Sequence, residues 1–253
     1  MRVIVQREGV DRQVIVVPDA AALAQEAAGR ILEQARAAVE SRGRFSLALS
    51  GGSTPQDTYR LLAQEPYRDQ VPWDKVHLFW GDERCVPPDD PGSNYHLADR
   101  LLISRVPIPA ENVHRIPGEL APEAAARAYR RELEDFFCGP APRLDLVLLG
   151  LGGDGHTASL FPGAESLEAL SDTVLPAEAE YEGRPAQRVT LALPAINAAR
   201  QILFLVSGEA KAGIVAQVLG SRSGSLPAER VCPTAGELVW LLDEPAASGL
   251  TEE

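Results

Sequence analysis

Long apolar runs, cysteines and lysines are scarce in this sequence of 253 residues. No apolar run approaches the ~18 residues that a membrane-spanning helix needs, and the opening MRVIVQREGV lacks the apolar core of a signal peptide. We therefore expect a cytoplasmic protein that has no membrane partner. The three cysteines, Cys85, Cys138 and Cys232, lie far apart without a CxxC pair, which argues against a disulfide framework and a zinc site.

Positive charge is also in short supply, because the formal net charge at pH 7 is −12. A chain this acidic is a poor partner for nucleic acid or for an anionic membrane surface. If the substrate is an anion, its pocket must gather positive side chains locally. Only two lysines are present, Lys75 and Lys211, so a lysine in an unusual place is informative.

Short apolar runs alternate with amphipathic stretches along the chain. This alternation predicts an α/β fold, with a Rossmann-like and mostly parallel sheet and helices on both faces. We expect one domain over residues 1–253. Strands are predicted at residues 3–5, 13–17, 45–49, 76–80, 112–116, 144–149, 188–193, 202–206 and 237–242. Helices are predicted at about residues 20–39, 55–62, 94–102, 122–137, 194–199 and 209–219, with an irregular excursion at 163–185 and a frayed tail at 249–253.

Four of these segments share one design, in which a buried strand leads into a polar or glycine-rich turn and then into a helix. The turns lie at residues 50–55, 81–84, 150–157 and 207–211. The carboxyl ends of parallel strands meet at one edge of a sheet, where open α/β folds bind their ligands. We therefore expect these four distant turns to converge on one pocket.

The first turn, SGGSTP, has the composition of an anion cradle. Gly51 and Gly52 let backbone N–H groups approach a phosphate, and the hydroxyl groups of Ser53 and Thr54 add donors beside a helix N-terminus. The turn is not a P-loop, because the terminal Gly-Lys-Ser/Thr is absent. A capped helix start after a glycine turn explains the motif equally well.

Two cations follow other strands. Arg84, in the turn Gly-Asp-Glu-Arg, can bind a phosphate or carboxylate through two hydrogen bonds or stabilise an oxyanion. An ion pair with Asp82 or Glu83 is the alternative. Lys211 lies in the first turn of a predicted helix, where a cation opposes the helix dipole. Anion binding and a solvated side chain are both open for Lys211.

The central turn, GLGGDGHT, contains the candidate catalytic residue. His156 follows a buried strand, and a neutral imidazole accepts a proton from water near neutral pH. Asp154 either orients this imidazole or contacts the substrate. The formal GxGxxG match at residues 150–155 does not favour a dinucleotide site, because Pro162 interrupts before a long helix forms. Neither a metal-ligand cluster nor a GxSxG elbow is present, and the other histidines, His77, His96 and His114, are expected to be structural.

Taken together, LALSGGSTP, WGDERCVPPDDPGSNY, LGLGGDGHTASLFP, LPAIN and SGEAKA resemble the 6-phosphogluconolactonase family. This family is related to the glucosamine-6-phosphate deaminases and ribose-5-phosphate isomerases. The resemblance covers about residues 20–245 and implies hydrolysis of 6-phospho-D-glucono-1,5-lactone to 6-phosphogluconate in the oxidative pentose phosphate pathway. It implies a sugar-phosphate lactone as the small-molecule partner, and no metal or organic cofactor.

The resemblance also implies roles for single residues. His156 would be the general base and Lys211 would hold the phosphate, while Arg84 would line the pocket with Gly51, Gly52 and Ser53. Asp82 and Asp154 match positions that are acidic in the deaminases too.

Two other functions stay open at this point. The related deaminases carry a Glu downstream of the His, and this sequence has Phe161 near that place, which disfavours a deaminase or isomerase. A sugar-phosphate sensor would not need a base, so His156 argues against it. We expect a monomer or a weak homodimer.

Overall fold

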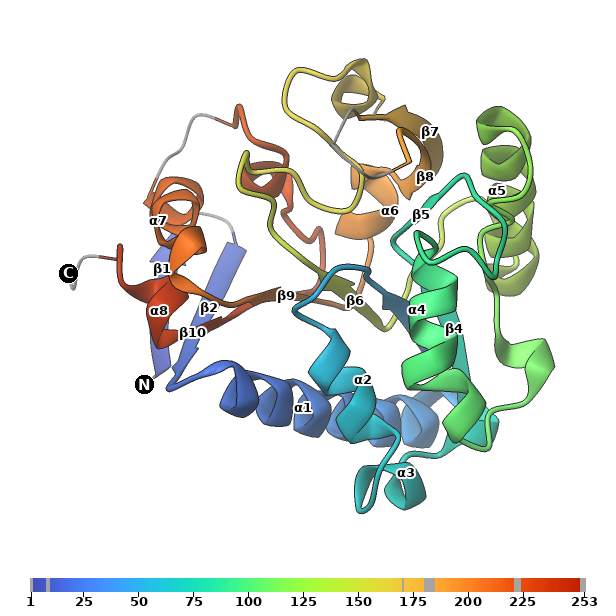
Figure 1. The fold of residues 1–253 in the computed structure, drawn as a ribbon, viewed down its shortest axis with the longest axis horizontal. Coiled ribbons are helices and arrows are strands. Elements are labelled where there is room, and N and C mark those ends of the chain that lie inside the picture. Colours follow the sequence, from blue (N-terminus) through green and yellow to red (C-terminus); the bar gives the residue numbers. More distant parts are fainter. Residues whose placement is uncertain (1, 8–9, 170, 180–184, 221–223, 251–253) are drawn as a thin grey trace.

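The computed structural model describes residues 2–7, 10–169, 171–179, 185–220 and 224–250. Within them, seven strands form a sheet in the order β1–β2–β10–β9–β6–β3–β4 (Figure 1). Every neighbouring pair is parallel except β1 with β2, which confirms the expected mostly parallel sheet. The strands are β1 (Arg2–Arg7), β2 (Val10–Val17), β3 (Phe45–Leu49), β4 (Val76–Trp80), β6 (Leu146–Leu149), β9 (Gln201–Val206) and β10 (Glu237–Asp243).

Helix α1 (Ala20–Arg42) runs along one face of this sheet beside α2 (Gln56–Leu62) (Figure 1). The Asp19 carboxylate caps α1 by accepting a hydrogen bond from the Ala22 N–H at 2.8 Å, and Gly43 ends the helix with a φ of 75° that favours glycine. The other α-helices are α3 (Tyr67–Gln70), α4 (Asn94–Leu101), α5 (Pro122–Phe137), α6 (Leu193–Asn197), α7 (Ala212–Gly220) and α8 (Glu244–Ala247). Short 3-10 helices lie at Trp73–Lys75, Ile103–Arg105, Ala110–Asn112, Glu165–Glu168, Glu209–Lys211 and Pro227–Arg230.

A second, antiparallel sheet is the main departure from the predicted fold. Its described strands are β5 (Asp82–Arg84), β8 (Gln187–Leu191) and β7 (Val174–Glu178), in that order. The predicted strand at residues 188–193 is therefore real but pairs with β5 and β7 rather than in the main sheet. The excursion at 163–185 contains β7. Its residues 170 and 180–184 lie outside the described part of the chain, as do residues 251–253 of the predicted tail.

The predicted strand at residues 112–116 is wrong. The chain there follows a 3-10 turn at Ala110–Asn112, and Val113 makes only an isolated bridge to Leu78. Pro109 and Pro117 flank the segment, and a proline cannot donate to a strand ladder. The apolar residues that suggested a strand instead pack against the core from a loop.

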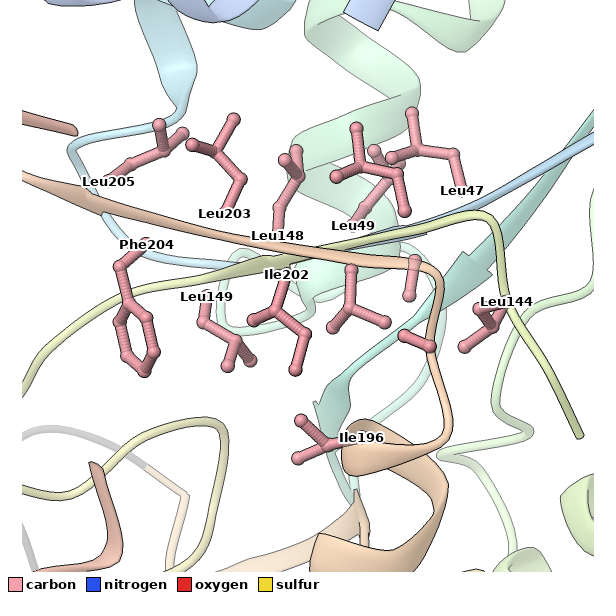
Figure 2. Packing of buried hydrophobic residues seen from close by; sticks show 14 of the residues in the cluster. Leu47, Leu49, Leu144, Leu148, Leu149, Ile196, Ile202, Leu203, Phe204 and Leu205 are labelled. Carbon is pink, nitrogen blue, oxygen red and sulfur yellow. The ribbon is translucent and has the colours of Figure 1, made fainter. Parts of the chain in front are cut away.

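Apolar side chains cover both faces of the main sheet, as expected for parallel strands buried on both sides. Successive residues of β9 alternate between the faces, with Leu203 and Leu205 on one side and Ile202 and Phe204 on the other (Figure 2). Burying each such side chain contributes about 1.5–3 kcal/mol. No helix in the described ranges is long and apolar enough to cross a membrane.

Strands β3 and β6 lie side by side in the sheet, and the chain leaves them in opposite directions. After β3 it passes through α2 to β4 on the outer side, whereas after β6 it reaches β9 on the other side. Ligands of open α/β sheets bind at such a switch point, beyond the carboxyl ends of the strands. The turns at residues 50–55 and 150–157 follow these two strands.

Candidate active site

A cavity of about 550 Å³ lies at this switch point. Its volume suits a small-molecule ligand. It is lined by Ser50, Gly51, Gly52, Ser53, Thr54, Pro55, Asp82, Arg84, Asn94, Gly150, Leu151, Gly152, Gly153, Asp154, His156, Ala158, Arg188 and Lys211. All four predicted turns contribute, and every residue proposed from the sequence as catalytic or substrate-binding is among the lining residues.

His156 is paired with Asp154 inside the same turn. The imidazole Nδ1 lies 2.5 Å from Asp154 Oδ1, and the same oxygen accepts the His156 backbone N–H at 3.1 Å. A carboxylate at Nδ1 favours the tautomer that keeps its proton there, which leaves the Nε2 lone pair available as a base. The imidazole is 24% exposed and its partner carboxylate 44% exposed, so the pair borders the cavity rather than the core.

The glycines of this turn make the pairing possible. A Cβ on Gly152 would lie 2.0 Å from His156 Nδ1 and 2.6 Å from Asp154 Oδ1, far inside van der Waals contact. The Gly152 N–H also donates to the His156 carbonyl at 2.8 Å, and Gly155 adopts a φ of 84° that side chains rarely tolerate. The GxGxxG-like spacing therefore serves the imidazole and its carboxylate, not a dinucleotide.

The buried Tyr59 side chain forms hydrogen bonds with the first residue of the SGGSTP turn. The Tyr59 hydroxyl accepts from the Ser50 N–H at 3.1 Å and donates to the Ser50 carbonyl at 2.7 Å, and burial raises the pKa of this phenol. Gly51 packs so closely on the Asn94 amide that a Cβ would lie 1.9 Å from its Oδ1. The cradle predicted from sequence is thus a fixed loop that faces the cavity.

Three cations face the cavity in a molecule whose net charge is −12. The Lys211 ammonium donates to the Leu151 carbonyl at 2.7 Å, which ties the fourth turn to the histidine turn. The Arg84 guanidinium donates to the Gly92 carbonyl at 2.5 Å. The third cation, Arg188, was not predicted as a site residue. Together they give the pocket the local positive charge that an anionic substrate requires.

Arg188 and Asn94 are the polar cavity residues that lie outside the predicted turns. Arg188 lies on β8, which the sequence assigned to the main sheet, and Asn94 begins α4 after a proline-rich loop. In the sequence, Arg188 stands at the start of an apolar strand, where surface arginines are common. Its position there did not mark it as a site residue. Pairing of β8 with β5 is what brings it to the cavity.

Asp82 is buried, and its carboxylate is occupied by the protein itself. One oxygen accepts from Asn94 Nδ2 at 3.2 Å and the other from Ser159 Oγ at 2.6 Å. These bonds connect β5 to α4 and to the segment after His156. Asp82 therefore holds Asn94 and Ser159 in place at the wall of the cavity.

Phe161 packs directly against the imidazole of His156. Its ring centroid lies 4.8 Å from that of His156, and the Arg188 guanidinium lies 5.9 Å from the same ring. The phenyl ring therefore limits the solvent around the imidazole and also lies near the arginine.

Two of the other histidines, His77 and His114, have structural surroundings. His77 Nδ1 lies 3.1 Å from His114 Nε2, and His114 Nδ1 lies 2.6 Å from Glu132, beside stacked aromatic rings. Burial, followed by the charges of His114 and Arg44, lowers the pKa of His77 to about 4. Among the described residues no group of three or more histidine, cysteine and acidic side chains could hold a metal ion.

An open α/β sheet with an imidazole–carboxylate pair and several cations at its carboxyl edge defines a class of enzymes for small anionic substrates. The family described as glucosamine-6-phosphate isomerases/6-phosphogluconolactonase matches residues 18–240. The chain therefore belongs to this family, on its 6-phosphogluconolactonase side.

Three comparisons illustrate this membership. A 6-phosphogluconolactonase of a Nostoc species is 42% identical over 246 residues, which are 95% of this chain and 99% of the relative. The structure of 6-phosphogluconolactonase from Trypanosoma brucei is similar with a TM-score of 0.84 and 30% identity, over 94% of this chain and 98% of the other. A monomeric glucosamine-6-phosphate deaminase, at 22% identity and a TM-score of 0.80 over 94% and 99%, shares the fold.

Proposed function

We propose that this chain hydrolyses 6-phospho-D-glucono-1,5-lactone to 6-phosphogluconate, the lactonase step of the oxidative pentose phosphate pathway, without a metal or organic cofactor. The observation that carries the proposal is the Asp154–His156 pair beside three cations in one cavity. A base and a local excess of positive charge are what a phosphorylated lactone requires. The proposal includes a cytoplasmic location and a monomer or weak homodimer.

Binding is proposed to begin at the phosphate. Lys211 supplies one charge-assisted hydrogen bond, and the backbone N–H groups and hydroxyls of Ser53 and Thr54 supply others, next to Gly51 and Gly52. Fixing the phosphate sets the lactone carbonyl near His156, so that attack by water becomes in effect intramolecular.

The chemistry is proposed to follow from His156. Nε2 accepts a proton from water while the water oxygen bonds to the lactone carbonyl carbon. The carbonyl electron pair moves onto oxygen, and Arg84 or backbone N–H groups stabilise this oxyanion. When the carbonyl reforms, its bond to the ring oxygen breaks, and the imidazolium returns its proton to that oxygen as it becomes a hydroxyl group. The new carboxylic acid releases a proton to solvent.

Asp154 is proposed to stabilise the imidazolium formed in the first step and to keep Nδ1 protonated throughout. Arg188 is proposed to add to anion binding, because it lines the cavity as the cross-strand neighbour of Arg84. Asp82 is proposed to serve the site by holding Asn94 and Ser159 rather than by reacting.

Proton release from freshly prepared lactone, measured in a pH-stat and corrected for spontaneous opening, tests the function. We expect His156→Ala to lower kcat by about 10²–10⁴-fold, as general bases contribute, while His96→Ala on α4 leaves it unchanged. Turnover by folded His156→Ala at the wild-type rate would contradict the base assignment. Release of ammonia from glucosamine-6-phosphate by the wild type would favour the deaminase alternative, and lactone bound without turnover would favour a sensor.

A further inference from the structure

Glu83 lies between two cavity residues, Asp82 and Arg84, and the residue is only 2% exposed. Four donors converge on it. Oε1 accepts the backbone N–H groups of Arg84 at 2.7 Å and Asn94 at 2.6 Å, and Oε2 accepts the Tyr95 N–H at 2.7 Å and the Ser93 hydroxyl at 2.9 Å. The side chain thus connects β5 to the N-terminus of α4 across the loop between them.

An acidic group at this depth is costly unless its hydrogen bonds are complete. Burial raises the pKa of Glu83, while the hydrogen bonds from Asn94, Tyr95, Arg84 and Ser93 oppose that rise. Two of the four donors are first-turn N–H groups of α4, which have no partner inside their own helix. Ser93 meanwhile caps the helix by accepting from the His96 N–H.

The loop that Glu83 closes is the loop that holds the Arg84 guanidinium. Arg84 Nη1 donates to the Gly92 carbonyl at 2.5 Å, and the Gly92 N–H is in turn fixed by Asp90 Oδ1 at 2.7 Å. Glu83 therefore binds the backbone of Arg84 at one end of this loop and the three residues just after Gly92 at the other. The Arg84 guanidinium is therefore held by the same loop whose two ends are joined by the Glu83 carboxylate.

We propose that Glu83 is the positioning residue for Arg84, and that its carboxylate sets where the guanidinium meets the anionic part of the substrate. This inference rests on the proposed function, in which Arg84 stabilises the oxyanion. This role differs from a purely stabilising one. If the carboxylate only stabilised the fold, replacing it would lower kcat/KM by the same factor whether or not Arg84 is present.

A double-mutant cycle on lactone turnover separates these two roles. Glu83→Gln keeps the shape but replaces one acceptor oxygen by a donor, so both donors of that oxygen lose their partner. We expect Glu83→Gln alone to lower kcat by roughly ten- to hundredfold with a smaller change in KM, as for a displaced catalytic group. In an Arg84→Ala background the same change should alter kcat/KM by less than about twofold, because coupled residues are not additive.

Asp145→Asn is the matched control. Asp145 is also a buried carboxylate with several donors, namely the Ser46 N–H and hydroxyl and the Arg42 and Arg200 guanidiniums. It precedes β6 and so lies at the amino-terminal end of that strand, whereas the cavity lies beyond the carboxyl ends. We expect it to lower the melting temperature as Glu83→Gln does while leaving kcat/KM unchanged. If Glu83→Gln fails to fold, Ser93→Ala removes one donor to Glu83, together with the α4 cap, and enters the same cycle.

Wild-type kcat in folded Glu83→Gln, or an equal loss of kcat/KM in both backgrounds, would overturn the positioning role. Absence of lactone turnover in the wild type would instead refute the proposed function. In that case the rise in melting temperature with inorganic phosphate decides the role of Glu83, because a displaced Arg84 weakens anion binding. A smaller rise in Glu83→Gln than in Asp145→Asn supports the inference, and an equal rise overturns it.

Discussion

Arg84 on β5 and Arg188 on β8 occupy directly opposed positions in an antiparallel strand pair, and both line the cavity. Like charges placed opposite one another across two strands destabilise a sheet. The Arg84 Nε–H is also buried without a hydrogen-bond partner among the described residues. An anion that contacts both guanidiniums would relieve this repulsion, so the pair is expected to bind part of the substrate.

This relationship predicts that inorganic phosphate stabilises the protein through Arg188. We expect phosphate to raise the melting temperature relative to chloride at equal ionic strength. Arg188→Gln removes a charge-assisted contact of about 1.5–3 kcal/mol, which corresponds to a roughly ten- to hundredfold loss of phosphate affinity. Arg36→Gln, which changes an exposed arginine bonded to Gln70, is the control. An identical phosphate response in the two variants would remove Arg188 from anion binding.

Gly152→Ala should disable catalysis without unfolding the protein. The new methyl group would stand 2.0 Å from His156 Nδ1, so the imidazole and the Asp154 carboxylate must both move. A shift of about 1 Å at a reacting group lowers kcat by roughly 10²-fold. Gly153→Ala is a matched control, because a Cβ there meets nothing within 4 Å. Equal kcat values for the two variants would show that the imidazole position is not critical.

Lys211→Ala should act on substrate binding more than on the chemical step. If the ammonium holds the phosphate equally in ground and transition states, KM rises while kcat is nearly unchanged. The loss of a charged hydrogen bond of about 1.5–3 kcal/mol predicts a roughly ten- to hundredfold rise in KM. Lys75→Ala, at an exposed lysine paired with Asp74, provides the comparison. An unchanged KM in Lys211→Ala would exclude this lysine from phosphate binding.

His77 should make the fold sensitive to mild acid. Its pKa falls from 6.5 to about 4 on folding, first because of burial and then because of the charges of His114 and Arg44. Between these values the unfolded chain binds the proton and the folded chain does not, so stability decreases as the pH falls from 6.5 toward 4. His77→Gln should flatten this part of a plot of urea midpoint against pH, and His96→Gln should not. Parallel plots for all three proteins would rule out His77 as the cause.

The chain should unfold as one unit. One cluster of buried apolar side chains extends from Val14 to Ala246 through both faces of the main sheet. We therefore expect far-ultraviolet circular dichroism and tryptophan fluorescence to report the same thermal midpoint. Two separated transitions would instead indicate more than one domain within residues 1–253.

The sequence alone determined the strands of the main sheet and the four turns that line the cavity. Buried parallel strands are nearly continuous apolar runs, and the strands Phe45–Leu49, Val76–Trp80 and Leu146–Leu149 are visible in the sequence for that reason. Their turns contain glycines beside His156 and Ser53, and parallel strands place all such turns at one edge. The lysine turn after Gln201–Val206 follows the same rule.

Tertiary structure alone decided which side chains complete the pocket. β5 has three residues, two of them acidic, and carries no apolar pattern, so its pairing with β8 is invisible in the sequence. That pairing brings Arg188 to the cavity. The closure of a proline-rich loop brings Asn94 against Gly51 and lets four donors hydrogen-bond to the Glu83 carboxylate. Strand pairing and loop closure depend on contacts between residues far apart in the chain, whereas apolar periodicity is local, and only local patterns can be read directly from a sequence.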